Sequence, residues 1–87
     1  MIMSKLDKAK ARLISIPRDY TYTEAKMLLG QLGFKEYNKG KTSGSRVKFF
    51  RESDGEIILM HKPHPKDIMA VQAVRDLAKV LKELGEI

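Results

Sequence analysis

The spacing of apolar residues predicts two helices in the first third of the chain. In the opening 17 residues, apolar positions recur at helical intervals after Ser4, which is suited to act as an N-cap. Pro17 ends this leading helix. A second stripe of apolar residues follows Thr21, and Gly33 stands where a helix ends in a residue with positive φ. We therefore expect two short helices joined by a tight connection.

Three strands are predicted to follow, at Phe34–Tyr37, Ser45–Arg51 and Glu56–Lys62. The Asp54-Gly55 pair between the second and third is a strong hairpin signal, so these two strands should pair antiparallel. The longer glycine-containing connection between the first two can close a second hairpin. The pattern predicts a three-stranded antiparallel meander.

A last helical stripe runs from Lys66 towards the end of the chain. The predicted order is therefore helix, helix, strand, strand, strand, helix. Helices on one face of a small antiparallel sheet make an α+β fold, and the core order α-β-β-β-α is that of double-stranded-RNA-binding domains. We expect one domain over residues 1–87, with a leading helix at 1–17 and a core at 21–85.

The second predicted strand alternates between two kinds of side chain. Val47 and Phe49 fall on one face, whereas Arg46, Lys48 and Phe50 fall on the other. The first face should pack in the core, and the second should be cationic with one aromatic ring.

The third predicted strand is apolar on both faces. If helices cover only one side of the sheet, Ile58 and Met60 would be exposed beside Phe50, and an exposed apolar patch usually marks a partner surface. Alternatively, the leading helix covers these residues. Both arrangements are compatible with the sequence.

Composition points to an anionic partner and is compatible with a reducing compartment. The 17 Lys and Arg residues exceed the 11 Asp and Glu residues, which gives a net charge of +6 on 87 residues. Such a charge favours nucleic acid or an acidic protein as partner. The absence of cysteine excludes disulfides and thiolate metal sites, and the sequence has no apolar run of membrane-spanning length. We expect a cytoplasmic protein with no membrane partner and no cofactor.

No catalytic triad or metalloprotease motif is present. The candidate catalytic residues are therefore the two histidines, because histidine is the side chain whose ordinary pKa allows proton transfer near neutrality. A metal site at His61 and His64 is disfavoured, since Asp67 is the only further ligand nearby. We expect His64 to be the N-cap of the last helix, where an anion is favoured, with Lys62 and Lys66 on either side. The alternative is that His64 caps the helix and does nothing else.

The loop before the second strand, "NKGKTSGS", has a similar double interpretation. Its hydroxyls and backbone N–H groups can bind a phosphate, or the loop can be an ordinary solvated connection. Arg46, which follows the loop, cannot act as a base but can stabilise charge on a phosphoryl oxygen. The predicted RNA-binding residues, here and near the histidines, are Lys39, Lys41, Thr42, Ser43, Gly44, Ser45, Lys48, Lys62 and Lys66.

The runs "YTEAKMLLGQLGF", "GKTSGSRVKFF", "LMHKPHP" and "VQAVRDLAKVLKELG" together resemble the HicA family of bacterial toxins. The resemblance covers residues 21–85, and its most specific parts are the pattern formed by Gly44, Ser45 and Phe49 and the Pro-His-Pro turn. It implies a fold like that of double-stranded-RNA-binding domains, metal-independent cleavage of mRNA, and neutralisation by a HicB-like antitoxin. At the position where the family usually has its catalytic histidine, this chain has Arg46.

The resemblance therefore implies a set of catalytic roles. His64 is the leading acid or base, His61 is a weaker second, and Arg46 and Lys48 act electrostatically. Because Arg46 replaces the usual histidine, one alternative is a non-catalytic RNA-binding module or an inactive toxin relative that still binds an antitoxin-like protein. A third possibility is a protein-interaction domain whose basic face binds an acidic partner.

Overall fold

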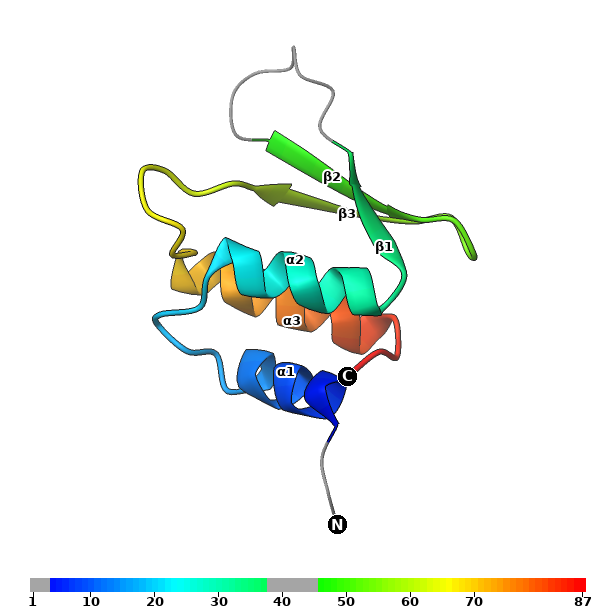
Figure 1. The fold of residues 1–87 in the computed structure, drawn as a ribbon, viewed down its shortest axis with the longest axis horizontal. Helices are drawn as coiled ribbons and strands as arrows, with labels where there is room; N and C mark the ends of the chain where they lie inside the picture. The colour runs from blue at the N-terminus through cyan, green and yellow to red at the C-terminus, as the bar shows by residue number, and fades with distance from the viewer. Residues whose placement is uncertain (1–3, 38–45) are drawn as a thin grey trace.

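The computed structural model describes residues 4–37 and 46–87. Within these ranges the chain forms helices and strands in the predicted order (Figure 1). The elements are α1 (Lys5–Ile14), α2 (Tyr22–Gln31), β1 (Phe34–Tyr37), β2 (Arg46–Arg51), β3 (Glu56–His61) and α3 (Val71–Glu83). None of the helices in the described ranges has the length and apolar character needed to cross a membrane.

The three strands form one antiparallel sheet in the order β1-β2-β3. All three helices lie on the same side of it, with α2 and α3 next to the sheet and α1 beyond them (Figure 1). We call the side that faces the helices the inner face and the other side the open face. The predicted α+β class and the meander are confirmed.

The core lies between the inner face and the two nearer helices. Val47 and Phe49 of β2 are almost completely buried, at 2% and 1% exposure, which confirms the predicted alternation of that strand. They pack with the apolar stripes of the helices. The buried helical residues are Leu13 of α1, Tyr22, Ala25, Leu28 and Leu29 of α2, and Val74, Leu77, Ala78 and Leu81 of α3.

The leading helix begins as its sequence predicts. The Ser4 hydroxyl accepts a hydrogen bond from the Asp7 N–H at 3.1 Å, and the Asp7 carboxylate accepts one from the Ser4 N–H, so the capping box is complete. Arg12 then ties the helix to α2, because its Nε lies 2.7 Å from Oε2 of Glu24. The leading helix therefore packs on the other helices and not on the sheet.

Arg51 joins the end of α2 to the sheet and to the C-terminal segment. Its guanidinium donates to the Leu32 carbonyl at 3.0 Å and to the Glu86 carboxylate at 2.8 Å, while its carbon Cζ lies 4.6 Å from the centre of the Phe34 ring. A paired interaction with Asp54 orients the same side chain in the β2–β3 turn. Polar contacts therefore close this end of the core.

The last helix begins at Val71, so the expectation that it starts near Lys66 with His64 as N-cap is wrong. Its N-cap is Ala70, which makes no side-chain capping bond. Just before the helix, Ile68 forms an isolated antiparallel bridge with Thr21, whereas residues 64–67 are bends. The Met69 N–H donates to the Tyr20 carbonyl at 2.8 Å, and the Tyr22 N–H donates to the Asp67 carbonyl at 2.7 Å. These long-range backbone bonds replace the predicted first helical turn.

Candidate nucleic-acid interface

The open face of the sheet carries the exposed basic and aromatic side chains. Opposite residues of antiparallel strands point to the same side of a sheet, so the register assigns each side chain to a face. The open face consists of Lys35, Tyr37, Arg46, Lys48, Phe50, Ile57, Leu59 and His61. All of these side chains are exposed except Phe50, which is partly buried.

Aromatic rings and a cation lie together at the centre of this face. The rings of Tyr37 and Phe50 meet edge to face, with centroids 6.0 Å apart and an interplanar angle of 69°. The Lys48 ammonium lies 6.0 Å from the Tyr37 centroid. Exposed rings can stack on nucleic-acid bases, and nearby cations can bind the phosphates between them.

Arg46 and His61 are directly opposite each other in the β2–β3 register. The Cβ atoms of such cross-strand pairs are about 4.5 to 5.5 Å apart. Both residues are exposed on the open face. A group able to transfer protons therefore lies beside a permanent cation, and Lys48 is two residues along the same strand.

The expected exposure of Ile58 and Met60 is wrong. They are buried at 4% and 8% exposure, whereas Ile57 and Leu59 of the same strand are 51% and 69% exposed. Pairing with β2 determines which residues of β3 face the core, because Ile58 is opposite the buried Phe49. The core buries Ile58 and Met60, and the leading helix does not reach the sheet.

Of the expected partner surface, only Phe50 lies on the open face. The sequence contained a signal for the missed residues. A hairpin at Asp54-Gly55 pairs Phe49 with an even-numbered residue of the third strand, which turns the odd-numbered Ile57 and Leu59 outward. The exposure of Ile57 and Leu59 therefore follows from the way the third strand pairs with the second.

His64, Lys62 and Lys66 lie in the connection between β3 and α3, and all three are exposed. The Lys62 ammonium lies 5.8 Å from the centre of the Tyr22 ring, at the start of α2. The connection places His64 three residues beyond the Arg46–His61 pair. The other predicted RNA-binding residues, Lys39, Lys41, Thr42, Ser43, Gly44 and Ser45, lie outside the described residues.

Asp67 anchors the far end of this connection. Its Oδ2 accepts a hydrogen bond from the Thr23 N–H at 3.1 Å, in the first turn of α2. Hydrogen bonding from Thr23 holds the pKa of Asp67 below its ordinary value, with a smaller contribution from Lys62. The carboxylate therefore acts as a second cap for α2.

A polar cluster that the sequence did not reveal lies between α2 and β1. The Tyr22 hydroxyl donates to the Glu36 carboxylate, and the Lys26 ammonium lies 3.0 Å from the other oxygen of Glu36. Burial raises the pKa of Tyr22, and the bond to Glu36 raises it further. Burial acts to raise the pKa of Glu36 as well, but the bonds from Tyr22 and Lys26 outweigh it and the pKa is lowered. The cluster orients β1 on α2.

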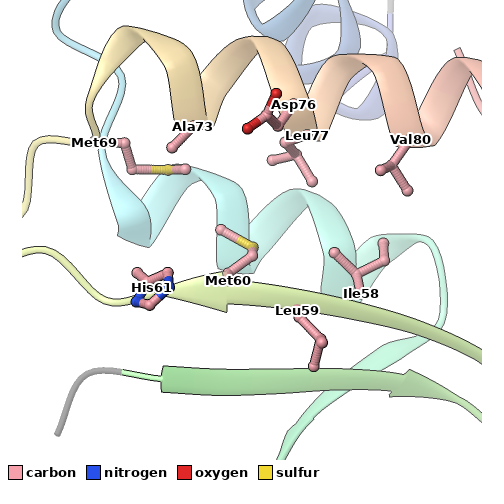
Figure 2. Close-up of a pocket in the computed structure, with 9 residues that line it drawn as sticks. All are labelled: Ile58, Leu59, Met60, His61, Met69, Ala73, Asp76, Leu77 and Val80. Atoms are coloured by element: carbon pink, nitrogen blue, oxygen red, sulfur yellow. The ribbon is translucent and has the colours of Figure 1, made fainter.

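A cavity of about 140 Å³ runs between β3 and α3 (Figure 2). Ile58 and Met60 point from β3 towards Leu77 of α3 and towards Met69, which precedes that helix, while Leu59 points to the other side of the strand (Figure 2). The lining is mainly apolar. No group of three or more His, Asp or Glu side chains that could hold a metal ion occurs in the part of the chain that the structure describes.

These features define a class: a small basic α+β protein with a cationic, aromatic open sheet face. A model of the family described as the HicA toxin of bacterial toxin–antitoxin matches residues 22–85, and this chain belongs to that family. It is therefore a toxin of a toxin–antitoxin system, which implies an antitoxin as partner. No curated protein and no solved structure gives a significant match.

Proposed function

We propose that this toxin is a metal-independent endoribonuclease that cleaves mRNA in the cytoplasm and is neutralised by a HicB-like antitoxin. Membership of the HicA family supports the proposal, and one observation carries it: Arg46 and His61 are cross-strand neighbours on an exposed basic face. The core order α-β-β-β-α, which is also that of double-stranded-RNA-binding domains, is consistent with RNA as the ligand.

The reaction needs a base, an acid and a cation around one phosphodiester. The base removes the proton of the ribose 2′-hydroxyl, and the 2′-oxygen then bonds to phosphorus. The bond from phosphorus to the 5′-oxygen breaks, and the acid donates a proton to this leaving oxygen. The products are a 2′,3′-cyclic phosphate and a 5′-hydroxyl, so this step consumes no water.

His64 and His61 are the residues proposed for these two proton transfers. From the sequence His64 is the leading candidate, and the cross-strand contact with Arg46 strengthens the case for His61. Arg46 is the proposed electrostatic group, because a guanidinium stays protonated and can stabilise the charge that develops on the phosphoryl oxygens. Each role requires the substrate phosphate to lie between β2, β3 and the connection that follows β3.

RNA binding is assigned to the open face and its surroundings. Lys48, Lys62 and Lys66 would contact phosphates, while Tyr37 and Phe50 offer rings on which bases can stack. The residues from Lys39 to Ser45 that the sequence analysis assigned to RNA remain part of the proposal.

A non-catalytic toxin relative is the second candidate, and one observation favours it. Arg46 stands at the position where the resemblance implies a catalytic histidine. If His61 does not compensate for that change, the chain binds RNA or its antitoxin without cutting.

The test is incubation of the purified protein with mRNA in EDTA. We compare the wild type with His61→Ala, His64→Ala and Arg46→His, and we monitor fold by circular dichroism. Wild-type cleavage should persist in EDTA, and loss of the catalytic histidine should lower the rate about a hundredfold or more. Lys8→Gln, an exposed change on α1, is the matched control and should cut normally.

Two outcomes would contradict parts of this proposal. Full activity in both histidine variants would remove the histidines from the mechanism. An inert wild type together with an active Arg46→His variant would establish the non-catalytic relative.

A further inference from the structure

The sheet has two edges, and they differ in chemistry. The strand order leaves β1 at one edge and β3 at the other. β1 has four residues and includes Lys35 and Glu36, and short charged edges resist pairing with other chains. β3 has six residues, and its centre from Ile57 to Met60 is an unbroken apolar run. Of the two, only the β3 edge lacks these protective features.

Apolar surface lies on both sides of the β3 edge. On the open face, Ile57 and Leu59 are 51% and 69% exposed. On the inner face, the cavity between β3 and α3 lies beside Ile58 and Met60 (Figure 2). A strand added to this edge would cover both apolar areas at once and satisfy the edge backbone groups.

We propose that a second copy of this chain pairs its β3 with this β3, antiparallel, about a two-fold axis at Leu59. Such an axis continues the sheet so that the inner faces of both copies lie on the same side. Inner residues must then oppose inner residues. With the axis at Leu59, Ile58 is opposite Met60 of the second copy, and each Leu59 is opposite the other.

Several registers place inner residues opposite inner residues, and charge distinguishes this one from the others. The axis at Leu59 brings Glu56 opposite Lys62 of the second copy, so symmetry forms two pairs of opposite charge. Moving the axis to Ile58 or Met60 shortens the paired segment and leaves one member of each charge pair without its partner. The sequence from Glu56 to Lys62 is therefore complementary to itself.

The same self-complementarity favours a second copy over an unrelated strand. Seven paired residues on each chain make a small interface, and the net charge of +6 on each copy opposes association. The dimer is therefore weak and concentration-dependent, with half-association expected at about 10 to 100 μM.

The first experiment is sedimentation velocity of the full chain from about 1 μM to about 1 mM, a range that brackets the expected affinity. Leu59→Lys places two ammonium groups against each other at the axis and should weaken dimerisation at least about tenfold. Met27→Lys is the matched control, because Met27 is 61% exposed on α2 and the change adds the same charge. It should dimerise like the wild type.

The second experiment reverses the charges. Glu56→Lys and Lys62→Glu should each weaken association about tenfold, because each puts like charges opposite one another twice. The double variant exchanges the two residues at constant net charge and should restore association. Melting curves verify that each variant is folded.

The proposal is overturned if the wild type stays monomeric up to about 1 mM. It is equally overturned if Leu59→Lys dimerises as well as Met27→Lys, or if the double variant remains as weak as the single ones. A monomeric toxin whose β3 amides become protected only when an antitoxin is added would assign the edge to that partner instead.

Discussion

At the scale of single residues, Glu36 is a partly buried carboxylate held by two partners. Its carboxylate accepts from the Tyr22 hydroxyl and pairs with Lys26 at 3.0 Å, while its side chain is 19% exposed. The bonds that lower its pKa exist only in the folded chain, so they link ionisation to stability. A group with a lowered pKa stabilises the fold above its unfolded pKa, and this contribution is lost as the pH falls through the folded value.

We predict that Glu36→Gln lowers the free energy of unfolding by about 1 to 2 kcal/mol at about pH 7. The amide can still accept from Tyr22 but cannot pair with Lys26. Below the ordinary pKa of 4.5 the carboxyl of the unfolded chain becomes protonated, whereas the folded one stays ionised to a lower pH, so the difference between wild type and variant should shrink as the pH falls towards about 3. Urea denaturation at the two pH values measures it.

Glu83→Gln is the control for this pH experiment. Glu83 is an exposed residue at the end of α3, and its side chain makes no hydrogen bond or ion pair with the described residues. The control should match the wild type at both pH values. A Glu36→Gln deficit that stays constant as the pH falls would show that the charge of Glu36 is not what stabilises the fold.

At the scale of elements, the junction between α2 and β1 depends on one glycine. Gly33 has φ of +95°, which side chains rarely tolerate, and a Cβ there would lie 3.2 Å from the Cδ of Arg51. That arginine holds the Leu32 carbonyl, Glu86 and Asp54 together, so it is not free to move away. The turn into the sheet therefore requires both the backbone conformation and the space.

We predict that Gly33→Ala destabilises the protein by about 1 to 2 kcal/mol, through backbone strain and the contact with Arg51. This corresponds to a drop in Tm of roughly 4 to 16 °C for a domain of this size. Thermal unfolding followed by circular dichroism measures the change.

Gly30→Ala makes the same substitution three residues earlier, with the opposite expectation. Gly30 lies inside α2, and open space surrounds its position. Because alanine is the better helix former, Tm should stay the same or rise, by up to about 1 kcal/mol in free energy. Equal destabilisation by both changes would rule out the positive φ and the Arg51 contact as the cause.

At the scale of the whole molecule, basic residues lie on two separate layers, the open face of the sheet and the outer helix α1. Lys35, Arg46 and Lys48 are on the open face of the sheet, whereas α1 lies beyond the other helices (Figure 1). The proposed RNA interface therefore predicts that charge on one face matters and that charge on the far layer does not. Net charge alone would make all lysines equivalent.

We predict that RNA binding weakens steeply between about 50 and 200 mM salt, because each phosphate contact releases counterions. Lys48→Gln should reduce the slope of log K against log salt by about 0.7, the contribution of one contact to a single strand. Lys8→Gln on α1 removes the same charge and should leave the slope unchanged. Fluorescence anisotropy with a labelled RNA measures both, and identical slopes in the two variants would exclude the open face as the binding surface.

Most elements were predictable because local chemistry encodes them. The Ser4 cap, Gly33 and the alternation of β2 specify local backbone or burial, and the structure agrees with each. The start of α3 was not predictable in this way. Residues 66–69 have a helical pattern, but residues 67–69 bond to residues 20–23, and this contact joins chain segments more than 40 positions apart.

The candidate site likewise combines features that were predictable from the sequence with features that were not. The sequence by itself determined the net charge, the absence of thiol chemistry, the two histidines and the cationic face of β2, because these follow from residue type and from a period of two. Only the tertiary structure decided that His61 is opposite Arg46, that Ile57 and Leu59 are the exposed apolar pair, and that Asp67 caps α2. The physical reason is that strand register and segment pairing are set by contacts between distant residues, and no local propensity contains them.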